Sequence, residues 1–179
     1  MKNHSGVGGV GRRWKITGGH MEKENASRFK FTNFVCDSRN ESLLLVHKCR
    51  LKAVRRDLTT LNFNGTLLKT IYNVRVHGQM FKRANGYKPW LYNITIDGCR
   101  FVRKPYEPVV LLVYNLFKSF SNFNRPCPYD GPVYVMGFHI IGAQIPVPLP
   151  SGEYLILIKW YTDNILFIST GVYFAFEEN

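Results

Sequence analysis

The segment EYLILIKWY, residues 153–161, alternates between two kinds of side chain. Its apolar positions are Tyr154, Ile156, Ile158 and Trp160. Glu153 and Lys159 fall on the opposite face, and because successive side chains of a strand point to opposite faces, this pattern predicts a strand with one buried face. Runs of the same kind, bounded by Gly, Pro, Asn or Asp, predict strands at 29–36, 43–54, 59–68, 71–80, 89–97, 132–141 and 165–176.

One segment breaks this period of two. Residues 107–121 carry apolar side chains at positions 109, 112, 113, 116, 117 and 120, which is the spacing of an amphipathic helix. Pro108 lies near the first turn, where its missing N–H leaves no bond unmade. About eight strands with one inserted α-helix near 107–121 predict a mostly β protein, an Ig-like antiparallel β-sandwich.

The length and composition favour one domain. The chain has 179 residues, of which 45% are hydrophobic, and a chain of this size usually builds a single core. The N-terminal segment has no apolar run that could form a signal-peptide core. We interpret residues 1–27 as a flexible tail or a segment from a wrong start site, and we assign 28–179 to one sandwich domain.

The formal net charge of +12 is unevenly distributed. Residues 1–104 contain 21 Lys/Arg and 6 Asp/Glu, whereas the rest of the chain has a net charge of −3. The basic residues are spread over many segments, and the tightest group, 50–56, is not a long basic helix. This disfavours nucleic acid as a partner and leaves contact with an anionic membrane surface or a receptor as the better interpretation.

The four cysteines of the chain are Cys36, Cys49, Cys99 and Cys127. Their spacing does not fit a zinc site, and an even number fits two disulfides, for which three connectivities exist. Pro126 and Pro128 fix the backbone on both sides of Cys127. We favour Cys99–Cys127, because this bridge would join the two ends of the helical insertion. Cys36–Cys49 would then be the second bridge, each contributing about 3–4 kcal/mol.

Four Asn-x-Ser/Thr sequons begin at Asn25, Asn40, Asn64 and Asn93. Several sequons in a short chain favour a secretory history, although chance in an Asn-rich sequence is the alternative. The strand pattern places Asn64 and Asn93 on the face opposite the apolar residues, where a glycan could reach water. We therefore predict glycosylation at Asn40, Asn64 and Asn93 of a secreted protein.

A series of segments gives the chain a family resemblance. In order they are FTNFVCDS, HKCRLKAVRRD, NGYKPWLYNITIDGCRF, NLFKSFSNFNRPCPYDG and LPSGEYLI. From about Phe29 to Phe176 the chain resembles an insect family of secreted proteins of uncharacterised function that includes the chemosensory B proteins. This family is distantly similar to the ML lipid-recognition sandwiches, such as the ganglioside activator. Cys127-Pro128, Tyr134 and residues 150–154 carry that second likeness.

The resemblance implies a secreted carrier of a lipid or other hydrophobic small molecule, held between two sheets and used in chemosensation. The residues expected to contact this ligand are Phe63, Val76, Met80, Trp90, Phe117, Phe138, Ile156, Ile158 and Trp160. The alternative is that these side chains simply fill the core. The chain would then be a secreted interaction module that binds a receptor or a cell surface.

Nothing in the sequence indicates catalysis. The chain has neither the G-x-S-x-G motif of a serine hydrolase nor the H-E-x-x-H motif of a zinc protease. Asp97 and Asp130 flank the proposed Cys99–Cys127 bridge, but roles at a strand end and in a turn explain both. We therefore expect no enzyme activity, no catalytic residues, no metal site and no cofactor.

Overall fold

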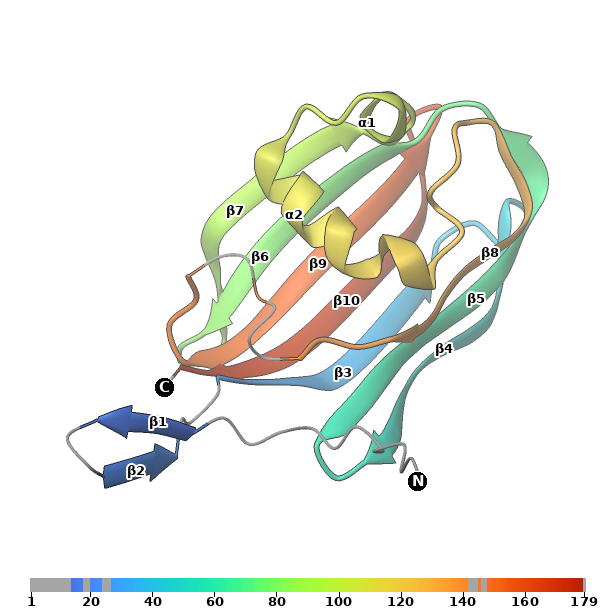
Figure 1. The fold of residues 1–179 in the computed structure, drawn as a ribbon. Helices are drawn as coiled ribbons and strands as arrows, with labels where there is room; N and C mark the ends of the chain where they lie inside the picture. The colour runs from blue at the N-terminus through green and yellow to red at the C-terminus, as the bar shows by residue number, and fades with distance from the viewer. Residues whose placement is uncertain (1–13, 18–19, 24–26, 142–144, 146–147, 179) are drawn as a thin grey trace, which may run out of the picture.

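The computed structural model describes residues 14–17, 20–23, 27–141, 145 and 148–178 (Figure 1). Two antiparallel sheets form a β-sandwich. The five-stranded sheet has the order β3 (Arg28–Ser38), β10 (Ile165–Glu177), β9 (Gly152–Thr162), β6 (Arg75–Arg83) and β7 (Tyr87–Asp97). The three-stranded sheet has the order β4 (Leu44–Arg55), β5 (Leu58–Ile71) and β8 (Tyr129–Phe138). The predicted eight-stranded sandwich is thus confirmed.

The helical insertion lies between β7 and β8. It contains α1 (Gly98–Arg103), α2 (Pro108–Phe117) and the 3-10 helix η1 (Lys118–Phe120). The helix predicted near 107–121 matches α2 and η1, with Pro108 in the first turn. The short α1 was not predicted. Its N-cap is Asp97, whose side chain accepts a hydrogen bond from the backbone N–H of Arg100 at 2.9 Å.

A separate two-stranded hairpin precedes the sandwich. Its strands are β1 (Trp14–Thr17) and β2 (His20–Lys23). They fall within residues 1–27, the segment that the sequence assigned to a tail. The remainder of that segment up to residue 26, with the Asn25 sequon, lies outside the described residues.

The second layer of the sandwich combines a sheet and a helix. Figure 1 shows α2 lying over the inner face of the five-stranded sheet, beside β8. After η1 the chain docks on β8, where the backbone N–H of Asn122 donates to the carbonyl of Tyr134 and Ser121 forms an isolated bridge with Val135. The narrow sheet therefore covers part of the wide sheet, and α2 extends over the rest.

Both predicted disulfides are present, as Cys36–Cys49 and Cys99–Cys127. The first joins β3 to β4 and thus links the two sheets along one side of the sandwich. The second joins α1 to the segment before β8. Among the described residues these are the two disulfides: one joins β3 to β4, and the other joins the segment directly after β7 to the segment directly before β8.

Two hydrophobic clusters fill opposite ends of the sandwich. The first contains Leu43, Leu44, Phe63, Leu67, Ile71, Tyr129, Val133, Phe167 and Ile168. The second contains Phe31, Leu61, Met80, Leu149, Tyr154, Phe174 and Phe176. Along β9, Tyr154 belongs to the second cluster and Trp160 packs against the first, so the middle of this strand lies between the clusters.

Tyr129 and Tyr154 anchor these clusters through their hydroxyl groups. Tyr129 donates to the carbonyl of Arg125 and Tyr154 to the carbonyl of Pro150. Burial raises the pKa of both phenols above the ordinary value of 10.0. In the unfolded chain these groups ionise at their ordinary pKa, so the folded state holds more protons above that pH.

We predict that the free energy of unfolding is independent of these tyrosines below about pH 10 and falls as the pH rises further. Denaturant unfolding across this range measures the effect. Ultraviolet absorbance should show that a fraction of the ten tyrosines ionises at a higher pH than the others. Tyr129→Phe and Tyr154→Phe should each reduce that fraction. Ionisation of every tyrosine in one step near pH 10 would contradict the prediction.

Candidate ligand-binding hollow

Gly78 lies at the centre of the wide sheet, on the face that points into the sandwich. In the register of β6 it is opposite Ile94 of β7 and Ile158 of β9. Its neighbours on the same face are Val76 and Met80, and Met80 belongs to the second cluster. Because side chains alternate along a strand, a side chain at position 78 would point inward.

The space above Gly78 is open. A methyl group placed on this residue would meet no heavy atom of the described chain within 4 Å. Gly65 in the facing sheet has no such space. A methyl group on that residue would lie 2.8 Å from the carbonyl oxygen of Leu45. We call the space over Gly78, bordered by Val76, Ile94 and Ile158, the central hollow.

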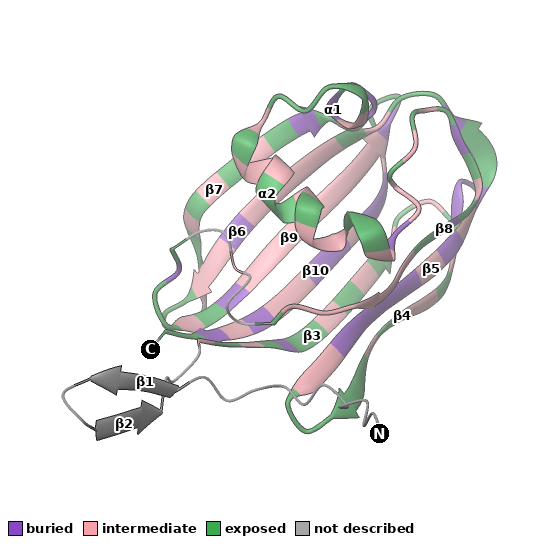
Figure 2. Ribbon diagram, in the orientation of Figure 1, coloured by how far each residue is buried: buried purple, intermediate pink, exposed green. Residues whose placement is uncertain are grey.

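The residues that border the central hollow are incompletely buried. Val76, Ile94 and Ile158 are each half-buried and belong to neither hydrophobic cluster. On β9 the residues between the buried Tyr154 and Thr162 are half-buried, and on β6 residues 76–79, next to the buried Met80, are half-buried as well (Figure 2). A close-packed interior would bury such aliphatic side chains fully, so the wide sheet keeps an unfilled apolar surface between its two packed ends.

Helix α2 faces this part of the sheet without filling it. No residue of α2 is fully buried. Its aromatic side chains contact the neighbouring elements α1 and β8. Tyr114 lies against Phe101 of α1, with 5.7 Å between ring centroids, and Phe117 lies against Phe138 of β8, with 6.2 Å between centroids. The hydroxyl group of Tyr114 donates to the carbonyl of Phe123. The helix is therefore held at its flanks.

The predicted contact residues separate into two groups in the structure. Phe63 and Met80 are only 8% and 7% exposed and belong to the two clusters. Trp160 packs on the first cluster, with its ring stacked on Phe123 at 5.8 Å. We leave these three residues out of the candidate site, because packed neighbours already cover them.

Of the other six predicted residues, two adjoin the central hollow, and Phe117 of α2 lies against Phe138 instead. Val76 and Ile158 border it directly. Ile156 is the next inward residue on β9 and packs against the second cluster together with Trp90 and Phe138. Sequence reasoning missed Gly78 and Ile94. A glycine inside an apolar strand was the available signal, since it often marks a close approach by a ligand or another backbone.

Lys82 brings a charge to the inner face at the end of β6. Its ammonium nitrogen lies 5.6 Å from the ring centroid of Trp90 and 5.7 Å from that of Tyr154. The residues that border the hollow itself are aliphatic or glycine. Such a surface offers an apolar molecule burial without directional hydrogen bonds.

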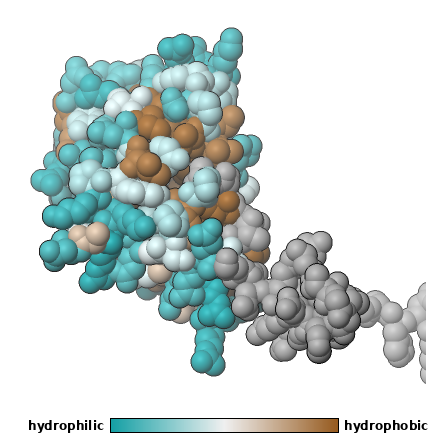
Figure 3. All heavy atoms as spheres, turned by 90° about the vertical axis from the view of Figure 1, so that its left-hand side faces the viewer, coloured by the Kyte–Doolittle hydropathy of each residue, from teal (hydrophilic) through white to brown (hydrophobic). Residues whose placement is uncertain are grey.

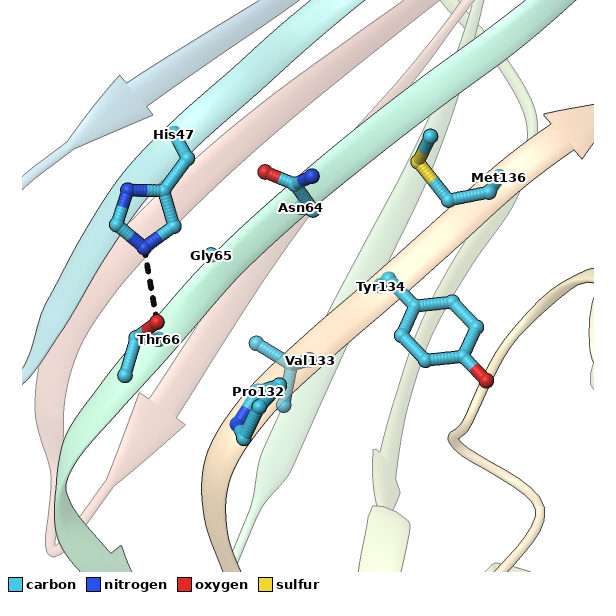
Figure 4. Close-up of a pocket in the computed structure, with 8 residues that line it drawn as sticks. All are labelled: His47, Asn64, Gly65, Thr66, Pro132, Val133, Tyr134 and Met136. Atoms are coloured by element: carbon cyan, nitrogen blue, oxygen red, sulfur yellow. Dashed lines mark hydrogen bonds between the residues drawn. The ribbon is translucent and has the colours of Figure 1, made fainter.

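A second depression lies on the outer face of the narrow sheet. It has a volume of about 400 Å³ and is lined by His47, Asn64, Gly65, Thr66, Pro132, Val133, Tyr134 and Met136 (Figure 4). The Nε2 atom of His47 is hydrogen-bonded to the hydroxyl group of Thr66 at 2.8 Å. The Oδ1 atom of Asn64 is buried and has no hydrogen-bond partner among the described atoms. This groove contains one of the predicted sequons.

Within the described ranges no three His, Cys, Asp or Glu side chains are grouped so that they could hold a metal ion. In that same part of the chain, neither helix is long and apolar enough to cross a bilayer.

Part of the chain matches a known protein family. Residues 76–156 match the model of a family described as a protein of unknown function (DUF1091). The matched segment runs from β6 into β9 and includes Gly78, Ile94 and α2, so it covers most of the central hollow. No curated protein matches the chain.

Proposed function

We propose that this protein is an extracellular carrier that holds one hydrophobic molecule, a lipid or a lipid-like compound, in the central hollow. The open space above Gly78 carries the proposal. A glycine at the centre of an inward-facing apolar surface leaves room where a sandwich would otherwise place a core side chain.

The chemistry of the hollow favours an apolar ligand. Each square ångström of apolar surface that the ligand and the walls remove from water contributes about 25 cal/mol. Val76, Ile94 and Ile158 are half-buried, so they gain from being covered. Their side chains carry no hydrogen-bonding groups, so shape and hydrophobicity would select the ligand.

Two further observations support export and carriage. Two disulfides in a chain of this size are compatible with an extracellular protein. The resemblance to secreted chemosensory B proteins and to ML lipid-recognition sandwiches, found in the sequence, points to the same role. On that resemblance the cargo would be a lipid or a lipid-like chemical signal.

An apolar fluorescent probe tests the proposal. We expect the purified oxidised chain to bind one probe per molecule with increased emission, and fatty acids, sterols or long hydrocarbons to displace it saturably. Absence of saturable binding would support the alternative, an interaction module with a filled core, and would overturn the carrier proposal.

Export also predicts glycosylation at three described sequons. Asn93 is exposed on the outer face of the edge strand β7, and Asn40 lies in the turn before β4. Asn64 opens onto the outer groove, so its glycan would lie beside Tyr134. Secreted from eukaryotic cells, the chain should lose mass on enzymatic deglycosylation, and Asn93→Gln should remove one glycan. An unmodified secreted chain would contradict this prediction.

A further inference from the structure

We infer that helix α2 is the surface through which this protein docks on an anionic lipid bilayer, so that one wall of the central hollow lies at the membrane. This inference rests on the proposed carrier function and names where cargo is exchanged. It depends on three features of the insertion: its apolar composition, its exposure and the charges at its ends.

Helix α2 is too apolar for an ordinary surface helix. Its sequence, PVVLLVYNLF, has no charged residue, and Asn115 is the only side chain that is neither aliphatic nor aromatic. A soluble protein usually buries a helix that is hydrophobic all round. Here none of the ten residues is buried, and Leu112 and Val113 are 37% and 40% exposed.

A hydrophobic area is exposed on the side of the molecule that carries β7. Figure 3, which looks at the molecule from the β7 side, shows hydrophobic atoms gathered in the upper part of this face, at the height of α2 in Figure 1. Hydrophilic atoms lie above them and to their left. An apolar patch with a polar rim marks an interaction site.

The charges beside α2 identify the partner. Arg103 and Lys104 precede the helix and Lys118 follows it, all three exposed, against one acid beside the helix, the N-cap residue Glu107. Among the described residues, no carboxylate forms an ion pair with any of them. An apolar helix with cations at both ends is complementary to a surface of anionic headgroups over hydrocarbon, which is how interfacial helices bind.

The geometry connects docking with cargo exchange. Tyr114 and Phe117 hold α2 to α1 and β8, while the half-buried middle of the wide sheet lies behind the helix (Figures 1 and 2). An apolar molecule leaving the hollow past α2 would therefore enter lipid rather than water.

Vesicle flotation tests this inference with the full oxidised chain. Vesicles contain phosphatidylcholine alone or mixed with phosphatidylglycerol. We expect binding to the anionic vesicles that weakens as salt is added. Each basic side chain near such a surface contributes about fivefold to binding, so Lys104→Glu with Lys118→Glu should weaken binding about 30-fold or more. Leu112→Asp with Val113→Asp should also release the chain.

Matched controls come from the narrow sheet. Arg50→Glu with Lys52→Glu reverses two exposed charges on β4, and Val54→Asp with Leu68→Asp places two acids at residues that are each 54% exposed. These variants should float nearly as well as the wild type. Absence of wild-type flotation would overturn the inference, and so would loss of flotation in these narrow-sheet controls with retention in the variants in and beside α2. So would equal binding by all variants.

Probe uptake separates this inference from the function it rests on. All variants should bind the apolar probe in vesicle-free solution, because every substituted side chain is exposed and none belongs to the part of the wide sheet around Gly78. A chain that takes up the probe but does not float would overturn membrane docking alone. A chain that floats but takes up no probe would overturn the carrier proposal.

Discussion

Gly78→Phe is expected to abolish binding of an apolar probe while leaving the protein folded. The new ring would point into the central hollow, where a methyl group on residue 78 meets no described atom within 4 Å. The aromatic side chain suits a strand and would cover Ile94 and Ile158 in place of a ligand. We expect the Kd for the probe to rise at least tenfold and the free energy of unfolding to be unchanged or higher.

Two variants control this experiment. Gln79→Phe adds the same side chain to the next residue of β6, which points away from the sandwich, and should leave the Kd unchanged. Gly78→Ala should keep most of the binding and raise stability by about 0.5–1 kcal/mol, since glycine is costly inside a strand. A Gly78→Phe variant that binds the probe as well as the wild type would show that cargo does not lie over Gly78.

Loss of the Cys99–Cys127 bridge is expected to give the largest loss of stability. The bridge closes a loop with a sequence separation of 28 residues, for which chain entropy predicts about 3–4 kcal/mol. For a chain of this length that corresponds to a fall in Tm of about 10 °C. Thermal unfolding of Cys99→Ser with Cys127→Ser, compared with the oxidised wild type, measures the effect.

The same variant should also exchange cargo faster, because the bridge fixes the insertion that carries α2. Removal of Cys36–Cys49, which spans 13 residues, is the matched control. It should cost about 3 kcal/mol but leave the rate of probe release close to that of the wild type, since it joins β3 to β4. Equal acceleration of release in both variants would argue against a specific role for α2 at the entrance.

The architecture was largely readable from the sequence. Alternation of side chains identified the strands of both sheets, and the apolar spacing at 107–121 identified α2. The cysteine pairing followed from the place of Cys99 and Cys127 at the two ends of the insertion. These features depend on local patterns, which a single sequence displays directly.

The central hollow was not readable in the same way. Phe63, Met80 and Trp160 were expected to contact a ligand but pack within or against the two clusters, whereas Gly78 and Ile94 border the open space. Alternation shows which residues point inward, but not which inward residues find a partner in the facing layer. That depends on how far the narrow sheet and α2 reach over the wide sheet, which is a property of the tertiary structure.

Native mass spectrometry of the oxidised chain, mixed with an excess of a long-chain apolar ligand, tests most directly whether the sandwich holds a single hydrophobic guest. We predict one predominant adduct with one ligand per chain for the wild type, and its loss in Gly78→Phe. Spectra in which the wild type carries no ligand, or a continuous distribution of several ligands, would contradict a defined binding hollow.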